Sequence, residues 1–130
     1  MSRSVIDRKI TSAKSLTPAL YIVATPIGNL GDLTMRARDI LAAADLVACE
    51  DTRVTGKLLS AFGLKRPLLA YNDHNAEKVR PTLLEAVRQG KAVALVSDAG
   101  TPLISDPGYK LVRDAAEAGL AVTAAPGPSA

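Results

Sequence analysis

The fold is decided by the stretch Ala92-Val93-Ala94-Leu95-Val96-Ser97-Asp98-Ala99-Gly100-Thr101-Pro102-Leu103-Ile104-Ser105-Asp106-Pro107-Gly108. It opens with an unbroken apolar run, 92–96, which is typical of a strand buried on both faces of a sheet. Beyond the stretch, apolar residues recur at the spacing of one helix face, at Leu111, Val112, Ala115 and Ala116. The stretch therefore predicts a strand, a connection and a helix.

The connection between this strand and this helix is long. It has twelve residues, 97–108, whereas a loop from a strand to a helix in an α/β protein usually has about two to six. Long loops at the carboxyl ends of parallel strands are where α/β proteins bind their ligands. Asp106 followed by Pro107 predicts the residue that caps the helix and the first residue inside it.

The rest of the chain repeats this alternation. Further apolar runs predict strands at Leu20–Ala24, Leu46–Cys49, Leu68–Tyr71 and Leu120–Ala125. Helical patterns lie between the strands, at about Thr34–Ala44, Arg53–Phe62, Ala76–Gln89 and Pro107–Ala118. Such alternation produces parallel strands joined by right-handed crossovers. The sequence thus predicts an α/β protein with a five-stranded, mostly parallel sheet and helices on both faces.

The helical patterns also predict which side chains face inward and where the helices stop. The expected inward residues are Met35, Ile40, Leu41 and Ala44 in the first helix, and Val54, Leu58, Leu59 and Phe62 in the second. A glycine follows each of the last three helices, at Gly63, Gly90 and Gly119. Glycine at this position is a common helix stop.

Composition excludes several classes of protein. A length of 130 residues with 48% hydrophobic residues fits one domain with a real core. Cys49 and His74 are the single cysteine and histidine, which excludes a disulfide within the chain and any metal site rich in either residue. No apolar stretch reaches 18 residues and residues 1–18 lack a signal-peptide core. We therefore expect a cytoplasmic protein with no membrane partner.

The net charge of +3 belongs to the first residues of the chain. Residues 1–18 hold four basic side chains and one acidic one, and residues 19–130 hold 12 of each. We interpret residues 1–18 as a disordered basic leader; the alternative is an arm that contacts nucleic acid phosphates. Composition gives the folded body, expected over residues 19–125, no electrostatic argument for nucleic acid. Residues 126–130, with Pro-Gly-Pro, fit either a linker to a second lobe or an ordinary C-terminus.

Polar residues follow each of the first four predicted strands. The segment 25–32 after the first strand has neither the dinucleotide-binding glycine pattern nor a P-loop. Its Thr25-Pro26 pair recurs as Thr101-Pro102 after the fourth strand. If the first and fourth strands are neighbours, the two loops form a crevice at the carboxyl edge of the sheet; otherwise they are two independent turns.

Two further clusters fall at the same edge. Glu50-Asp51-Thr52-Arg53 follows the second strand, where the carboxylates either assist proton transfer or, in the simpler interpretation, cap the next helix. Tyr71-Asn72-Asp73-His74-Asn75 follows the third strand, and its histidine is a substrate contact, a weak base or a plain surface residue. Ser97 and Ser105 lack the partners of a nucleophile. The residues alone predict a ligand site at this edge.

These blocks resemble a known family. Residues 20–32, 49–53, 71–75, 97–108 and 126–130 are similar, in one collinear series, to the ribosomal RNA small subunit methyltransferase I group of the tetrapyrrole (corrin/porphyrin) methylase superfamily. The resemblance implies S-adenosylmethionine as methyl donor and 2′-O-methylation of a cytidine ribose in 16S rRNA of the small ribosomal subunit. It also implies a two-lobed homodimer, of which this chain is the N-terminal lobe and, alone, incomplete for catalysis.

The resemblance also assigns roles to residues. It places the donor against Thr25, Pro26, Asp98, Gly100, Thr101, Ile104 and Ser105. It places the acceptor RNA against Arg53, Tyr71, Asn72 and Asn75, with His74, Asp51 or Glu50 as the base, and it requires no metal. Two alternatives remain: a methylase of the same superfamily with a tetrapyrrole or another acceptor, and a non-catalytic fragment that binds a partner.

Overall fold

A computed structural model describes residues 16–25, 33–98 and 105–125. In chain order the elements are β1 (Ala19–Thr25), α2 (Met35–Ala43), β2 (Leu46–Cys49), α3 (Thr52–Ala61), β3 (Leu68–Ala70), α4 (Ala76–Arg88), β4 (Ala92–Asp98), α5 (Asp106–Glu117) and β5 (Val122–Ala125). The predicted leader 1–18 and linker 126–130 therefore lie wholly or mostly outside the described residues.

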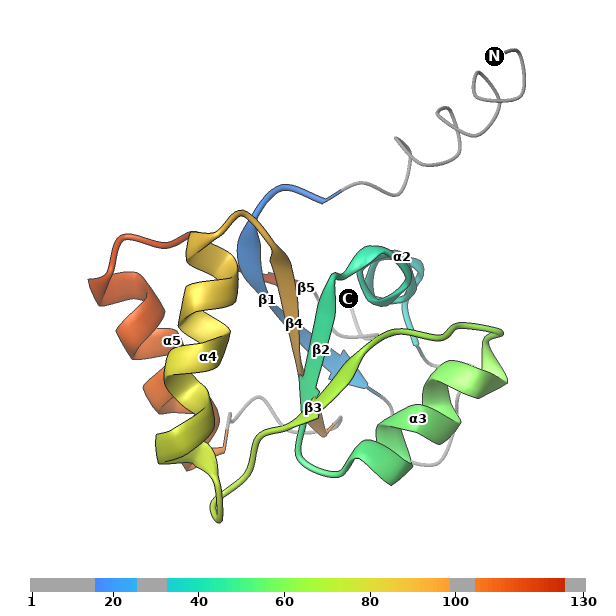
Figure 1. Cartoon of the computed structure of the whole chain (residues 1–130). Coiled ribbons are helices and arrows are strands. Elements are labelled where there is room, and N and C mark those ends of the chain that lie inside the picture. Colours follow the sequence, from blue (N-terminus) through green and yellow to red (C-terminus); the bar gives the residue numbers. More distant parts are fainter. Residues whose placement is uncertain (1–15, 26–32, 99–104, 126–130) are drawn as a thin grey trace.

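The strands form one five-stranded sheet in the order β3-β2-β4-β1-β5 (Figure 1). Every pairing is parallel. The prediction of a parallel α/β sheet is confirmed. Each connection along the chain leads either to the neighbouring strand or past one strand. β1, although first in the chain, lies inside the sheet between β4 and β5.

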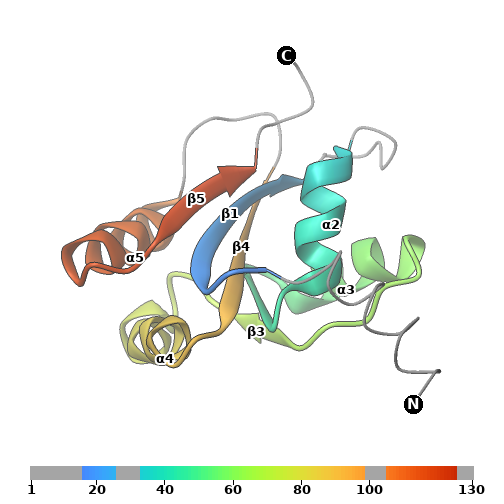
Figure 2. The same ribbon diagram turned by 90° about the horizontal axis from the view of Figure 1, so that it is seen from above.

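The helices cover the two faces of the sheet in pairs. α2 and α3 lie on one face, and α4 and α5 lie on the other (Figure 2). Because successive residues of a strand point to opposite faces, β1 contributes Tyr21 and Val23 to the core under α2 and Leu20 to the core under α4 and α5. The two faces together explain the continuous apolar runs of the sequence.

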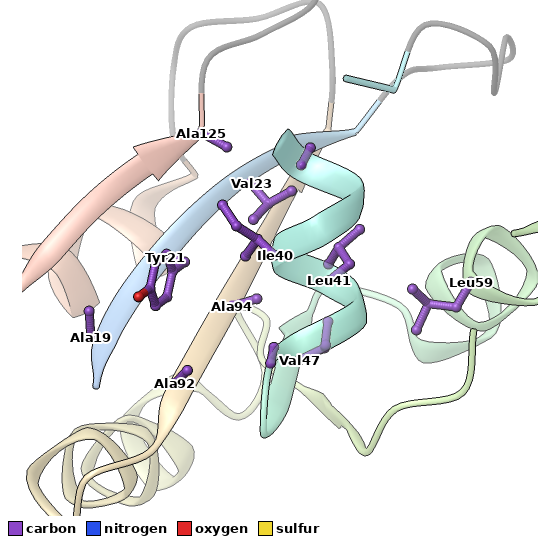
Figure 3. Packing of buried hydrophobic residues seen from close by; sticks show 12 residues of the cluster. Ala19, Tyr21, Val23, Ile40, Leu41, Val47, Leu59, Ala92, Ala94 and Ala125 are labelled. Atoms are coloured by element: carbon purple, nitrogen blue, oxygen red, sulfur yellow. The ribbon is translucent and has the colours of Figure 1, made fainter. Parts of the chain in front are cut away.

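The core under α2 is built from large helix side chains and small strand side chains. Ile40 lies on the side of α2 toward Val23, and Leu41 lies on the side toward Leu59 of α3 (Figure 3). Val23, Ile40 and Leu41 are at most 1% exposed. The short side chains of Ala92 and Ala94 leave room for those of the helix. This alanine-rich core is what positions the start of α2 at the carboxyl edge.

The ends of the helices follow the sequence. Gly63, Gly90 and Gly119 have φ angles of +70°, +95° and +77°, a backbone conformation that glycine adopts without strain. They lie at the amino edge of the sheet, just after α3, α4 and α5. The three predicted stops are confirmed.

The inward face of two helices was predicted wrongly in part. Met35 is 78% exposed and Val54 is 64% exposed. The buried face of α2 is Ala37, Ile40 and Leu41, and that of α3 is Thr55, Leu58 and Leu59. In α2, Ala37 precedes Ile40 by three positions and Leu41 by four, and in α3 Thr55 stands in the same relation to Leu58 and Leu59. Residues at these spacings lie on one face of a helix. Thr55 therefore takes the place expected for Val54.

The cap of α5 also differs from the prediction. Ser105, rather than Asp106, is the N-cap, and its Oγ accepts a hydrogen bond from the Gly108 N–H at 3.3 Å. Asp106 and Pro107 occupy the first two helical positions. Proline is tolerated there because the first N–H groups of a helix have no partner inside it.

Two apolar residues of α2, the buried Leu41 and the exposed Met35, provide a test of the core. We expect Leu41→Ala to lower the free energy of unfolding by about 2–5 kcal/mol, because it removes buried methyl groups and leaves a cavity. Met35→Ala, on the same helix but exposed, should change it by less than about 0.5 kcal/mol. Urea unfolding followed by circular dichroism measures both, and equal effects would contradict the packing described for α2.

Candidate functional site

The first half of the candidate site begins where β1 and β4 end. The two strands are neighbours, and Thr25 pairs with Asp98 in register. The condition for a crevice between their loops is therefore met. The chain leaves β1 toward α2 on one face and leaves β4 toward α5 on the other. In α/β proteins, ligands bind beyond the carboxyl ends of strands whose following helices lie on opposite faces of the sheet.

The residues predicted for the donor are only partly described. Pro26, Gly100, Thr101 and Ile104 lie outside the described residues, and Asp98 is described as the last residue of β4. Thr25 is buried, and its Oγ1 donates a hydrogen bond to the Ser97 carbonyl at 3.1 Å. This bond ties the ends of β1 and β4 together. The Ser105 hydroxyl is engaged in capping α5.

The second half is an open hollow between the carboxyl ends of β2 and β3. Its lining includes all three carboxylate or imidazole groups considered as bases, and consists of Glu50, Asp51, Thr52, Ala70, Asn72, Asp73 and His74. The structure thus brings together two clusters that are at least 18 positions apart in the sequence. They meet because β2 and β3 are adjacent and parallel.

Asp51 is the N-cap of α3. Its Oδ1 accepts a hydrogen bond from the Arg53 N–H at 2.9 Å, and its Oδ2 lies 3.3 Å from Nη2 of the Arg53 guanidinium. The hydrogen bonds from Arg53 hold the pKa of the Asp51 carboxyl below its usual range. The capping interpretation is confirmed. A carboxylate with a lowered pKa is a weaker base, so the geometry disfavours Asp51 in that role.

Asn72 and Asn75 build the turn after β3. The Asn75 amide donates to the Ala70 carbonyl at 3.0 Å and its oxygen accepts from the Asn72 N–H at 2.9 Å. The Asn72 amide donates to the Glu50 carbonyl at 3.3 Å, and its oxygen accepts from the His74 N–H at 3.0 Å. Both amides therefore shape the hollow and link its two clusters.

The Tyr71 side chain points into the protein. It is buried, its hydroxyl donates to the Pro107 carbonyl, and the same hydroxyl accepts from Nε of Arg80 at 2.9 Å. Arg80 is buried as well and reaches Glu77 at 3.2 Å. Burial raises the pKa of Tyr71. The hydroxyl thus joins the end of β3 to the first turn of α5.

Sequence reasoning missed Arg80. Its position carried a signal: Arg80 falls on the same helix face as Ala76, Leu83 and Val87, all of which are buried. A charged residue at an inward position is almost never buried without a partner. The Tyr71 hydroxyl, just after β3, is the hydrogen-bond acceptor that the buried Arg80 uses.

The remaining candidates are exposed. Glu50 and His74 are both exposed, and in the part of the chain that the structure describes nothing bonds to the His74 imidazole. Arg53 is 87% exposed beyond its ion pair. Burial raises the pKa of the Cys49 thiol, which disfavours a nucleophilic role.

Two further features concern metal ions and membranes. Within residues 16–25, 33–98 and 105–125, no group of three or more histidine, cysteine or carboxylate side chains is placed to hold a metal ion. Over the same ranges, none of the helices has the length and apolar character needed to cross a bilayer.

A doubly wound parallel sheet with helices on both faces is the class of fold that these observations define. Residues 19–130 match the family model of the tetrapyrrole (corrin/porphyrin) methylases, and the chain belongs to that family. This agrees with the resemblance found in the sequence.

Two curated relatives share more than half of their aligned residues with the chain. The chain is 58% identical over 118 residues to a protein of Mesorhizobium japonicum, covering 91% of the chain and 40% of the relative. It is 56% identical over 119 residues to a protein of Escherichia coli O157:H7, covering 92% of the chain and 42% of the relative. Both are named ribosomal RNA small subunit methyltransferase I. The chain therefore spans about two fifths of the length of these relatives.

Solved structures share the fold. Cobalt precorrin-4 methyltransferase has a TM-score of 0.68 at 24% identity, covering 90% of this chain and 47% of that one. Uroporphyrin-III C-methyltransferase of Thermus thermophilus has a TM-score of 0.65 at 24% identity, covering 83% of this chain and 46% of that one. At this identity the likeness concerns the fold alone.

The Tyr71 hydroxyl provides a second test. We expect Tyr71→Phe to lower the free energy of unfolding by about 1–3 kcal/mol, because Nε of buried Arg80 loses its acceptor. Tyr109→Phe is the matched control, since Tyr109 is 59% exposed on α5. Midpoints of urea unfolding measure both, and a loss no larger than that of the control would rule out the internal role of Tyr71.

The ion pair of Asp51 predicts a pH dependence. Because its pKa is lowered in the folded protein, the carboxylate stabilises the fold at pH values above its unfolded pKa. This contribution is lost as the pH falls through the lowered pKa. Asp51→Asn keeps a side chain that can cap, so wild type should be more stable than the variant near neutral pH.

The difference should vanish on acidification. Urea unfolding at a series of pH values measures it, with Asp73→Asn, in the same hollow, as the control. A wild-type advantage that persists at the acid end of the series would contradict the assignment to the charge of Asp51.

Proposed function

We propose that this chain forms the S-adenosylmethionine-binding lobe of an enzyme that methylates the 2′ oxygen of a cytidine ribose in 16S rRNA. The observation that carries the proposal is 58% identity, over nearly the whole lobe, to a relative named ribosomal RNA small subunit methyltransferase I. The identity covers every block that surrounds the carboxyl edge. The neighbouring ends of β1 and β4 support a donor site there.

The donor belongs in the crevice after β1 and β4. Thr25, Pro26, Asp98, Gly100, Thr101, Ile104 and Ser105 would line it. The register of Thr25 with Asp98 supports this assignment because it starts both loops from one point. Ser105 caps α5 with its hydroxyl, so its contribution to a ligand would come from the backbone. The donor, when bound, supplies a methyl group already activated on a sulfonium.

The acceptor belongs over the hollow between β2 and β3. Arg53 is exposed beside it and can meet a phosphate, while Tyr71, Asn72 and Asn75 act by holding the shape of the loop. The main task of these residues is to orient the 2′ oxygen for an in-line attack. Loss of the hydroxyl proton during that attack is helped by a nearby base.

His74 is the base that the geometry favours. An imidazole accepts protons near neutral pH, and His74 is exposed at the hollow with its backbone fixed by Asn72. Asp51 is engaged with Arg53 and has a lowered pKa. Glu50 stays the second candidate, because its side chain is exposed at the same hollow.

Other parts of the proposal concern the whole protein. We assign residues 19–125 to donor binding, 126–130 to the connection toward the remaining length of the relatives, and 1–18 to a basic leader. The rest of that length would supply the second wall of the cleft. We further propose that the whole protein is a cytoplasmic homodimer that acts on the small ribosomal subunit. A tetrapyrrole acceptor is less favoured, because the solved methylases that act on such compounds share only 22–24% identity.

The proposal is tested with a chimera in which this chain replaces the matching segment of the Mesorhizobium japonicum relative. Incubated with small ribosomal subunits and donor labelled in the methyl group, the chimera should place label on a ribose 2′ oxygen. Label on a base, on protein or on a tetrapyrrole would contradict the assignment. The chain alone should transfer no label, and transfer by the chain alone would overturn the need for a second wall.

The role of His74 is tested in the same chimera. His74→Asn should lower the rate of methyl transfer by about 10²- to 10⁴-fold, the usual contribution of a general base, without changing donor binding. Asp73→Asn, next to it in the hollow, is the control. A rate equal to that of the control would move the assignment to Glu50.

A further inference from the structure

The balanced charge of the folded body conceals two unlike helix layers. Residues 19–130 hold 12 basic and 12 acidic side chains. On the layer of α4 and α5, most cations are neutralised in ion pairs: Arg80 with Glu77 at 3.2 Å, Arg88 with Glu85 at 3.1 Å, Lys110 with Asp106 at 3.6 Å and Arg113 with Asp114 at 3.0 Å.

The layer of α2 and α3 is different. Between Asp51 and Asp73 the chain has four basic residues and no acidic one. Arg53 has its ion pair with Asp51, and Arg66 donates from Nε to the Ala44 carbonyl at 3.0 Å. The other cations of the layer are Arg36, Arg38, Lys57 and Lys65.

These four residues form what we call the basic surface. All four are exposed. Across the described ranges, no carboxylate lies within ion-pair distance of any of them. The Arg38 guanidinium lies 5.5 Å from the centre of the Phe62 ring, at the end of α3, and so connects the two helices.

The basic surface starts at the site and leads away from it. Arg36 is in the first turn of α2, which begins at the carboxyl edge, and Lys57 is one turn beyond Arg53 on the same face of α3. Lys65 follows α3 near the amino edge. α3 has 10 residues, about 15 Å of helix at 1.5 Å per residue. Both helices lie on the same side of the sheet (Figure 2).

We propose that the basic surface binds the phosphate backbone of the RNA substrate outside the site itself; this rests on the proposed function. Cations already paired with carboxylates gain little from a phosphate, whereas unpaired exposed cations displace the counterions condensed on the RNA. Exposed cations on two helices of one layer and just after them fit a polymer that carries one charge per unit. Their contacts position the substrate and carry no sequence information.

The test compares two double variants with the same change in charge. Lys57→Gln/Lys65→Gln removes two cations of the basic surface. Lys78→Gln/Lys91→Gln removes two exposed lysines that belong to α4 and its end, on the other layer, and that lack an ion pair among the described residues. Binding of a fluorescent RNA hairpin to the 130-residue chain is measured by anisotropy between about 50 and 200 mM salt.

For the first variant, the slope of log affinity against log salt should become less steep by about 1.4 to 1.8, since each of the two lost phosphate contacts contributes about 0.7 to 0.9. The second variant should keep the wild-type slope. The basic surface would not be the RNA contact if the two variants had equal salt slopes, or if Lys57→Gln/Lys65→Gln kept the wild-type slope. Equal binding of vesicles rich in phosphatidylserine, in competition with RNA, would overturn it in favour of a lipid surface.

Failure of this inference is distinguishable from failure of the proposed function. If the chimera methylates ribose while the first variant keeps the wild-type slope, the proposed function stands and the basic surface is wrong. If the wild-type chain binds no RNA and the chimera transfers no label to ribose, both fail together.

Discussion

The parallel pairing of β1 with β4 is the constraint on which the rest of the structure depends. It runs in register from Ala19 with Ala92 to Thr25 with Asp98. β4 also pairs with β2, and β1 with β5, so this single ladder joins the two halves of the sheet. A shift of one residue would turn Tyr21 and Val23 to the opposite face. The same ladder sets the two loops of the proposed donor site beside each other.

A buried hydroxyl connects the two halves of the site. Tyr71 follows β3 next to the hollow, but its side chain is buried in the core. Its hydroxyl donates a hydrogen bond to the Pro107 carbonyl in the first turn of α5, the helix that follows β4. Arg80 completes the arrangement from α4. Leaving such a guanidinium without its acceptor is costly because its desolvation is no longer offset. The two halves of the proposed site are therefore joined by one set of buried hydrogen bonds.

Local pattern predicted the elements, and long-range contacts decided what it could not. Strand Leu46–Cys49 was predicted to the residue because its ends coincide with a change from apolar to polar side chains. The adjacency of β1 and β4, 72 positions apart at Thr25 and Ser97, has no local signal. Thr55 replaced Val54 on the buried face because helix geometry outweighs hydrophobicity at one position. The inward turn of Tyr71 depended on a partner, Arg80, that only the tertiary structure supplies.

The three glycine turns after α3, α4 and α5 separate two demands on the molecule. They lie at the amino edge, whereas the described residues of the proposed site lie at the carboxyl edge. The glycine helix stops and the residues of the proposed site thus occupy opposite rims of one sheet. In evolutionary terms, a change of acceptor at the rim of the proposed site need not disturb these glycine turns. In practical terms, a reporter or an affinity tag inserted after Gly90 would lie at the edge opposite the proposed site.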